Sequence, residues 1–125
     1  MRKNKEFVKF YAEDFYNAGL CETVKGVAFR LYTFLLSNMG EDNKIHFSRK
    51  LRAEFYASNV KRSYASESLN MLICLNLVAR LGGNKFMINP LYATKTREKL
   101  EYKIFEEWSI QCKQKEKKIE KYIYF

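Results

Sequence analysis

Cysteine and histidine are scarce in this sequence, and their spacing argues against two classes of site. The chain of 125 residues has three cysteines, which lie far apart, and one histidine. No C-x-x-C pair is present, so we predict neither a disulfide framework nor a zinc site, and we expect reduced thiols. The residues concerned are Cys21, Cys74, Cys112 and His46. No metal and no cofactor are therefore predicted.

Long apolar runs are also lacking. The longest fall far short of the roughly 20 residues that a membrane-spanning helix requires, and no leading apolar segment with a small-residue cleavage site is seen. Glycine-rich phosphate loops, paired-carboxylate patterns and histidine clusters of the relaxase type are missing too. The sequence indicates no nucleophile or carboxylate as a partner for His46, which we interpret as a strand residue. We expect a cytoplasmic protein that is not an enzyme and has no membrane partner.

Positive charge is abundant and unevenly placed. The net charge is +9, yet residues 1–43 carry six basic and six acidic side chains and contribute nothing to it. Residues 44–85 carry eight basic and two acidic side chains, a net charge of +6, and residues 95–121 add +3. A charge that served only solubility would be spread evenly. The concentration in residues 44–85 therefore predicts that a polyanion binds there.

The stretch from Val60 to Pro90 has the pattern of a helix followed by a hairpin. Its apolar positions are spaced by four, three and three, which places them on one face of a helix that continues toward the VARL segment. A Gly-Gly-Asn turn between VARL and KFMIN then predicts a β-hairpin, or wing. The apolar positions are Ala65, Leu69, Leu72 and Leu75.

The residues before this stretch complete a helix-turn-helix. The KIHF segment is predicted to pair with the hairpin as a third strand, and Ser48 to cap the helix SRKLRAEFYA, which buries Leu51 and Phe55. Val60 is expected to enter the core at the turn, and the second helix to open at Lys61 or Arg62. The predicted fold is mainly α with a small antiparallel β wing: a winged helix-turn-helix plus a long C-terminal helix.

Three further elements precede this motif. Residues 7–11, FVKFY, are predicted as a short strand or an extended arm, and residues 14–20 as a short helix that ends at Gly19. Apolar residues recur at intervals of three and four from Val24 to Met39, with Gly40 as the stop. We expect this last helix to be the central buried one.

Length and composition predict one domain, residues 1–93, followed by a helical segment, residues 94–125. The apolar stripe of this last helix must cover either the domain's own surface or the same helix of a second copy. We favour a homodimer, because helix-turn-helix proteins commonly read two half-sites as symmetric dimers. The predicted dimer-interface residues are Leu100, Ile104, Trp108, Cys112 and Ile119.

Candidate DNA contacts follow from the faces of the predicted helices. Arginine can bind guanine, asparagine can bind adenine and a carboxylate can accept from cytosine N4, so the outward residues of the second helix are able to read bases. Basic residues elsewhere suit phosphate contacts, which fix register without reading sequence. The predicted base contacts are Arg62, Ser63, Ser66, Glu67 and Asn70; the phosphate contacts are Arg49, Lys50, Arg52 and Lys61; and the wing contacts are Arg80, Asn84 and Lys85.

The chain resembles the winged-helix replication proteins of small Firmicute plasmids, the RepL type, and more loosely other winged helix-turn-helix domains. The resemblance covers roughly residues 7–91 and is carried by FVKFY, LLSNMG, NKIHFSRKLRAEF and SLNMLICLNLVARLGGNKFMINP. It implies that the second helix and the wing bind duplex DNA without catalysis. Glu67 and Tyr64 on the exposed helix face, and the charged C-terminal helix, depart from the usual pattern.

Two functions from different classes follow as hypotheses. The first is sequence-selective binding of double-stranded DNA in replication initiation or transcription regulation of a plasmid, phage or other mobile element. Replication or transcription proteins are further candidate partners. The alternative is a protein-interaction module, in which the winged-helix scaffold and the C-terminal helix bind a protein partner. Binding of RNA or of single strands is a third hypothesis, which a preference for unpaired probes would reveal.

Overall fold

The computed structural model describes the backbone of residues 8–95 and 98–123, and the side chains of residues 8–95 and 101–113. Helices dominate the described chain, and the strands form two small antiparallel sheets. The prediction of a mainly α fold with a small antiparallel sheet is confirmed at this level. Among the described helices, none is long and apolar enough to cross a membrane.

The N-terminal part consists of one short strand and two short helices. Strand β1 is Lys9–Phe10, α1 is Ala12–Asn17 and α2 is Leu20–Thr23. The sequence predicts one helix here, but Gly19 adopts a left-handed φ of 72° and separates the two. Strand β1 pairs with β5, Ala93–Thr94, so this segment closes back onto the end of the domain.

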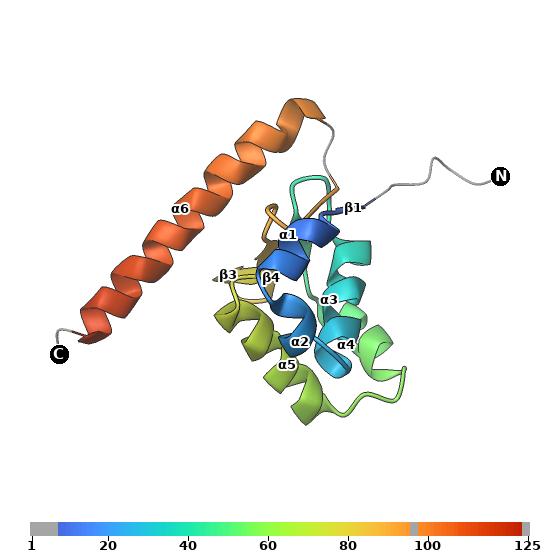
Figure 1. Cartoon of the computed structure of the whole chain (residues 1–125). Helices are drawn as coiled ribbons and strands as arrows, with labels where there is room; N and C mark the ends of the chain where they lie inside the picture. Colours follow the sequence, from blue (N-terminus) through green and yellow to red (C-terminus); the bar gives the residue numbers. More distant parts are fainter. Residues whose placement is uncertain (1–7, 96–97, 124–125) are drawn as a thin grey trace.

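Helix α3, Val27–Asn38, is the central element (Figure 1). Leu31, Tyr32 and Leu35 are completely buried along its inner face, as the spacing of three and four predicts. The helix begins later than the predicted Val24, because Gly26 precedes it with a φ of 61° that an α-helix does not allow. It packs against α5, and the core lies between them.

Two helices connected by a tight turn follow α3. Helix α4 is Arg49–Tyr56 and α5 is Arg62–Cys74. The predicted cap is confirmed, since the Ser48 hydroxyl accepts a hydrogen bond of 3.3 Å from the Leu51 amide. Val60 is buried in the connection, also as predicted. Helix α5 ends earlier than the sequence pattern predicts, and Asn76 then reverses the chain with a φ of 61°.

The three-stranded sheet has the order β2-β4-β3, with all neighbours antiparallel. Strand β2 is Lys44–His46, β3 is Val78–Gly82 and β4 is Lys85–Ile88. The KIHF segment is therefore the third strand of this sheet, as predicted. Because the hairpin strand β4 lies in the middle, it is held from both sides. Phe86, Met87 and Ile88 within it are fully buried.

A buried asparagine joins the sheet to β5. Asn43 is completely buried with a φ of 61°, and its side-chain amide donates to the carbonyls of Ile88 at 3.1 Å and Ala93 at 2.8 Å. Its side-chain oxygen accepts from the Lys95 amide at 3.3 Å. These bonds give hydrogen-bond partners to backbone carbonyl and amide groups that the short strands do not pair. The sequence pattern does not predict this role for Asn43.

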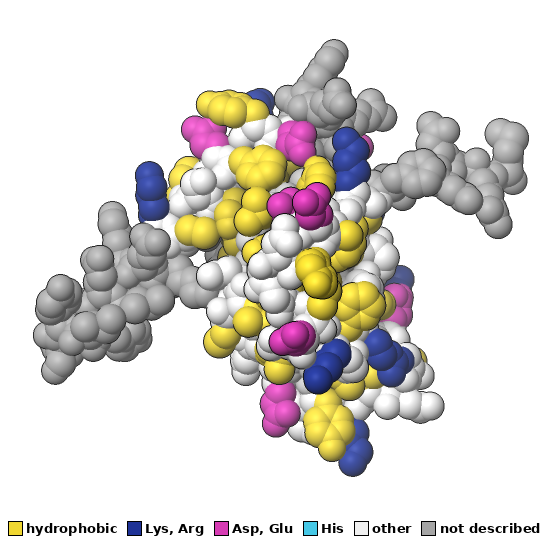
Figure 2. Space-filling model, in the orientation of Figure 1, with side chains coloured by type: hydrophobic (Ala, Val, Ile, Leu, Met, Phe, Trp, Pro, Cys, Tyr) yellow, Lys and Arg dark blue, Asp and Glu magenta, His cyan; other side chains and the backbone are white. Residues whose placement is uncertain are grey.

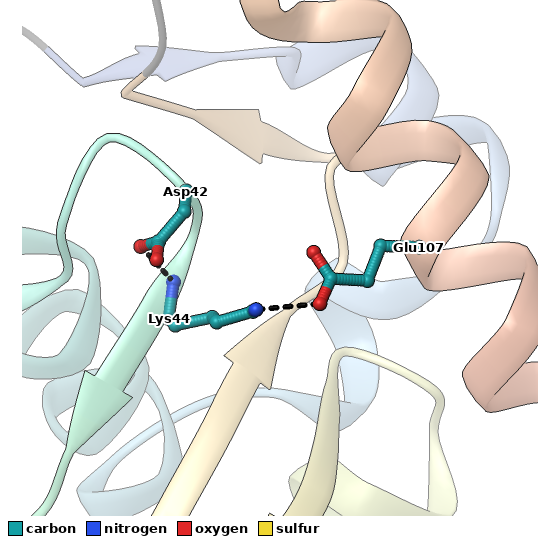
Figure 3. Close-up of polar contacts among 3 residues, drawn as sticks. All are labelled: Asp42, Lys44 and Glu107. Atoms are coloured by element: carbon teal, nitrogen blue, oxygen red, sulfur yellow. Dashed lines mark hydrogen bonds and ion pairs between the residues drawn. The ribbon is translucent and has the colours of Figure 1, made fainter.

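Helix α6, Glu98–Ile123, runs along one side of the domain (Figure 1). The Lys44 ammonium on β2 forms an ion pair of 2.5 Å with Glu107 on α6, and the Lys44 amide donates to the Asp42 carboxylate. Figure 3 shows both contacts. Closer to the start of α6, the Tyr11 hydroxyl donates to Glu101 at 3.0 Å. The first part of α6 is thus attached to its own domain.

The predicted dimer stripe of α6 partly faces this domain. Ile104 is only 3% exposed in the single chain, and Trp108 and Cys112 are half-buried. Ile104 is therefore covered by the chain's own domain. This is the first of the two alternatives predicted for the apolar stripe of α6. The side chains of Leu100 and Ile119 lie outside the described residues.

Candidate nucleic-acid interface

The outer face of α5 presents the five residues predicted to contact bases. Ala65, Leu69 and Leu72 are buried against the core, which turns the opposite face to solvent because a helix repeats every 3.6 residues. All five predicted residues on that face are exposed: Arg62, Ser63, Ser66, Glu67 and Asn70. We call this surface the exposed face of α5.

Two larger side chains flank the exposed face of α5. Tyr64 and Met71 are exposed and lie seven residues apart, which places them on the same side of the helix. The Lys61 ammonium lies 5.6 Å from the centre of the Tyr64 ring, a cation–π distance. Neither Tyr64 nor Met71 is among the predicted contact residues, although both fall outside the buried spacing of four, three and three.

A hollow of about 820 Å³ opens beside the start of α5. It gathers three arginines from two helices with the tip of the hairpin turn. Its lining residues are Arg49, Arg52, Ala53, Tyr56, Ala57, Arg62 and Asn84. We call it the basic hollow. It unites residues from three separate predicted groups: phosphate contacts, base contacts and wing contacts.

Two arginines of the basic hollow are exposed and form no ion pair with another described residue. Arg49 and Arg62 are exposed, and within the described part of the chain neither has a carboxylate at ion-pair distance. The Arg62 guanidinium lies 5.5 Å from the centre of the Tyr56 ring, which supports its planar group from one side. Guanidinium groups held in this way can donate paired hydrogen bonds to an anion such as phosphate.

Arg52 differs from its two neighbours because its guanidinium already has protein partners. Its Nε donates to the Phe47 carbonyl at 3.1 Å, and one terminal nitrogen donates to the side-chain oxygen of Asn84, also at 3.1 Å. The group also lies 4.7 Å from the centre of the Phe47 ring. Arg52 therefore connects α4 with the hairpin tip, a role that residue type alone does not reveal.

The other predicted contacts lie outside the lining of the basic hollow. Lys50 and Lys61 are exposed near the starts of α4 and α5. Lys85 is exposed on β4 opposite His46. Arg80 on β3 lies over Phe86, with its guanidinium carbon 5.2 Å from the ring centre. The structure thus gathers Arg49, Arg52, Arg62 and Asn84 at the hollow, whereas the other predicted basic contacts do not line it.

The face that carries α1 and α2 is different in character. Figure 2 shows acidic and basic side chains intermingled there with apolar ones. A second hollow, of about 330 Å³, lies between β1 and α3, and no basic residue lines it. Its lining is mostly apolar: Val8, Phe10, Phe29, Tyr32, Thr33, Leu36 and Ser37. The described residues include no cluster of three or more side chains suited to holding a metal ion.

Comparison of the chain with protein-family models, with curated proteins and with solved structures found no match.

Proposed function

We propose that the chain is a winged-helix protein that binds double-stranded DNA with sequence selectivity. The observation that carries this proposal is the basic hollow, which brings together the first residues of α4 and α5, Arg49 and Arg62, with Asn84 of the hairpin tip. The order α3, β2, α4, α5, β3, β4 and the sheet order β2-β4-β3 also suit a winged helix, with β3 and β4 as the wing.

In this proposal the basic hollow receives the DNA backbone. Arg49 and Arg62 donate paired hydrogen bonds to phosphate oxygens and release condensed counterions. Lys50 and Lys61 add charge beside the hollow. Arg62, which we predicted to contact a base, is assigned to phosphate because it lines the hollow over Tyr56.

Base reading is assigned to the middle of α5. Asn70 presents an amide that can bind both N6 and N7 of adenine, and Glu67 presents a carboxylate that can accept from cytosine N4. Ser63 and Ser66 serve as smaller donors or acceptors on the same face. The carboxylate of Glu67 repels phosphate, so it favours only those positions in which it meets a base edge. This balance supports selective rather than general binding.

The resemblance to plasmid replication proteins of the RepL type supports a role in replication initiation, and the fold serves equally well for transcription regulation. Both roles require the same first step, which is binding of a defined duplex site. A mobile element such as a plasmid or phage is the proposed genetic context, and its replication or transcription proteins are the proposed further partners.

Selection of bound duplexes from a random pool, followed by titrations at several salt concentrations, tests the proposal. We expect the affinity to fall steeply with salt, by about 0.9 log units per log unit of salt for each phosphate contacted. Asn70→Ala should reduce the preference for the selected site by about tenfold. Lys50→Ala should instead lower the affinity for all duplexes by the same factor. Absence of duplex binding, or binding that salt does not weaken, would contradict the proposal. Tighter binding of unpaired strands would point to the single-strand hypothesis.

A protein-interaction role is the second candidate, and the outward face of α6 favours it. Tyr102, Phe105 and Ile110 are 74%, 37% and 49% exposed on this helix. Such apolar groups suit contact with a second copy of the chain or with another protein. Light scattering of the wild type and of a variant with all three replaced by serine separates these outcomes. A dimer that becomes a monomer in the variant supports the homodimer; a wild-type monomer contradicts it.

A further inference from the structure

The tip of the hairpin between β3 and β4 has little internal support. Gly82 and Gly83 have φ values of 137° and 54°, and a Cβ built on either would meet no atom within 4 Å. The tip therefore stands clear of the surrounding side chains at both glycines. Glycine also leaves the backbone with more freedom than any other residue. Gly82 pairs with Lys85 within the hairpin, and the contacts that tie the tip to another element are made by Asn84, the residue that follows the glycines.

Two contacts hold Asn84 against the start of α4. Its backbone carbonyl accepts a hydrogen bond of 2.8 Å from the Phe47 amide. Its side-chain oxygen accepts from Arg52, whose Nε also donates to the Phe47 carbonyl. Arg52 thus binds both sides of the junction: the chain entering α4 and the residue that follows the glycines. We call this the Arg52–Asn84 contact.

We propose that Arg52 positions the wing for DNA and is not itself a phosphate contact. The proposal rests on the proposed function of duplex binding. Two of the donor nitrogens of Arg52 are used within the protein, and its planar group lies on the Phe47 ring. Arg49 and Arg62, which line the same hollow, carry no such bonds among the described residues and remain available for phosphate. The Arg52–Asn84 contact sets how far the wing tip stands from them.

The two roles considered for Arg52, positioning the wing and contacting a phosphate, predict opposite results for two substitutions. Lysine keeps the charge of Arg52 but lacks the planar fork that reaches two acceptors. If Arg52 positions the wing, Arg52→Lys should weaken duplex binding about as much as Asn84→Ala, by about fivefold each. The double variant should be no weaker than either single one, because both remove the same contact. The salt slope should stay at the wild-type value in all three, since none removes a phosphate contact.

Arg49→Ala is the matched control within the same hollow. It removes an arginine without internal bonds, so the salt slope should fall by about 0.9 for one lost phosphate contact. Arg52→Ala should leave the slope unchanged. If instead Arg52→Lys binds like the wild type and Arg52→Ala lowers the slope as Arg49→Ala does, Arg52 is a phosphate contact and the proposal is wrong. Losses that add in the double variant would also contradict it.

Amide hydrogen exchange in the free protein tests the contact without DNA. The Phe47 amide donates to Asn84, so it should exchange about fivefold faster in Arg52→Lys and in Asn84→Ala. The Leu35 amide in the core helix should not change, which shows that the variants remain folded. Unchanged exchange at Phe47 would overturn the proposed contact. A wild-type protein that binds no duplex would instead overturn the proposed function and, with it, the positioning role.

Discussion

Residues 8–43 and residues 44–85 contribute to one core but differ sharply in charge. The first region carries three basic and five acidic side chains, and the second carries eight basic and two acidic. Both supply completely buried residues, such as Leu31 from the first and Phe86 from the second. Burial therefore does not explain the difference. Concentrated like charge opposes folding by self-repulsion, and the proposed binding of DNA gives this concentration in one region a role.

The two hollows repeat this contrast. The hollow in the first region is mostly apolar and holds about 330 Å³, whereas the basic hollow of the second region holds about 820 Å³ and is lined by three arginines. Of these two hollows, only the second offers basic side chains to the proposed polyanion. Residues 8–43 thus contribute to the core, whereas residues 44–85 contribute to the core and also carry a concentrated positive charge.

Asn43 lies where the two regions meet, and its replacement should have the largest effect on stability. Asn43→Ala removes the donors to Ile88 and Ala93 and leaves a left-handed residue without its preferred side chain. We expect a loss of about 3 kcal/mol in the free energy of unfolding, measured by chemical denaturation.

Asn59→Ala is the control for this prediction. Asn59 also has a positive φ, of 66°, but its side chain is exposed. Asn59→Ala should lower the free energy of unfolding by only about 1 kcal/mol. If the two variants are equally stable, the side chain of Asn43 does not join the sheet to β5 as described.

Replacement of Tyr32 should change the stability less than replacement of Asn43, and it should raise the stability rather than lower it. Its hydroxyl is buried in the first region without a hydrogen-bond partner among the described residues, which is unfavourable. Tyr32→Phe should therefore raise the free energy of unfolding at neutral pH by about 1 kcal/mol. Tyr102→Phe on the exposed face of α6 should leave it unchanged.

The same hydroxyl predicts a dependence on pH. Burial, and then the nearby Tyr92, raise the pKa of Tyr32 well above its usual value. The folded protein thus keeps the proton after the unfolded chain has lost it, so wild-type stability falls as pH rises beyond about 10. The advantage of Tyr32→Phe should grow over that range in denaturation curves. An advantage that stays constant or shrinks would contradict the assigned burial.

Local patterns in the sequence predicted much of this fold. Ser48 as a helix cap and Ala65, Leu69 and Leu72 as the inner face of α5 depend on neighbours within a few residues, and the structure confirms them. Gly19 and Gly26 moved helix boundaries because a positive φ interrupts a helix regardless of the apolar spacing around it.

Side-chain contacts between residues far apart in the sequence were not predicted. Arg52 and Asn84 are 32 residues apart, and Asn43 and Ala93 are 50 apart. No periodicity links such pairs, since their partners are determined by the way the strands pair. The sequence therefore identified the basic residues of the candidate site, but not which of them already have a partner in the protein.

Matched removal of two charges from each region tests the central claim most directly. Arg49→Ala with Lys50→Ala removes two basic residues from the second region, and Lys9→Ala with Lys25→Ala removes two exposed ones from the first. The quantity to measure is the salt slope of duplex binding. We predict a fall of about 1.8 in the slope for the first pair, from two lost phosphate contacts, and no change for the second. Equal slopes in the two double variants would contradict the assignment of DNA binding to residues 44–85.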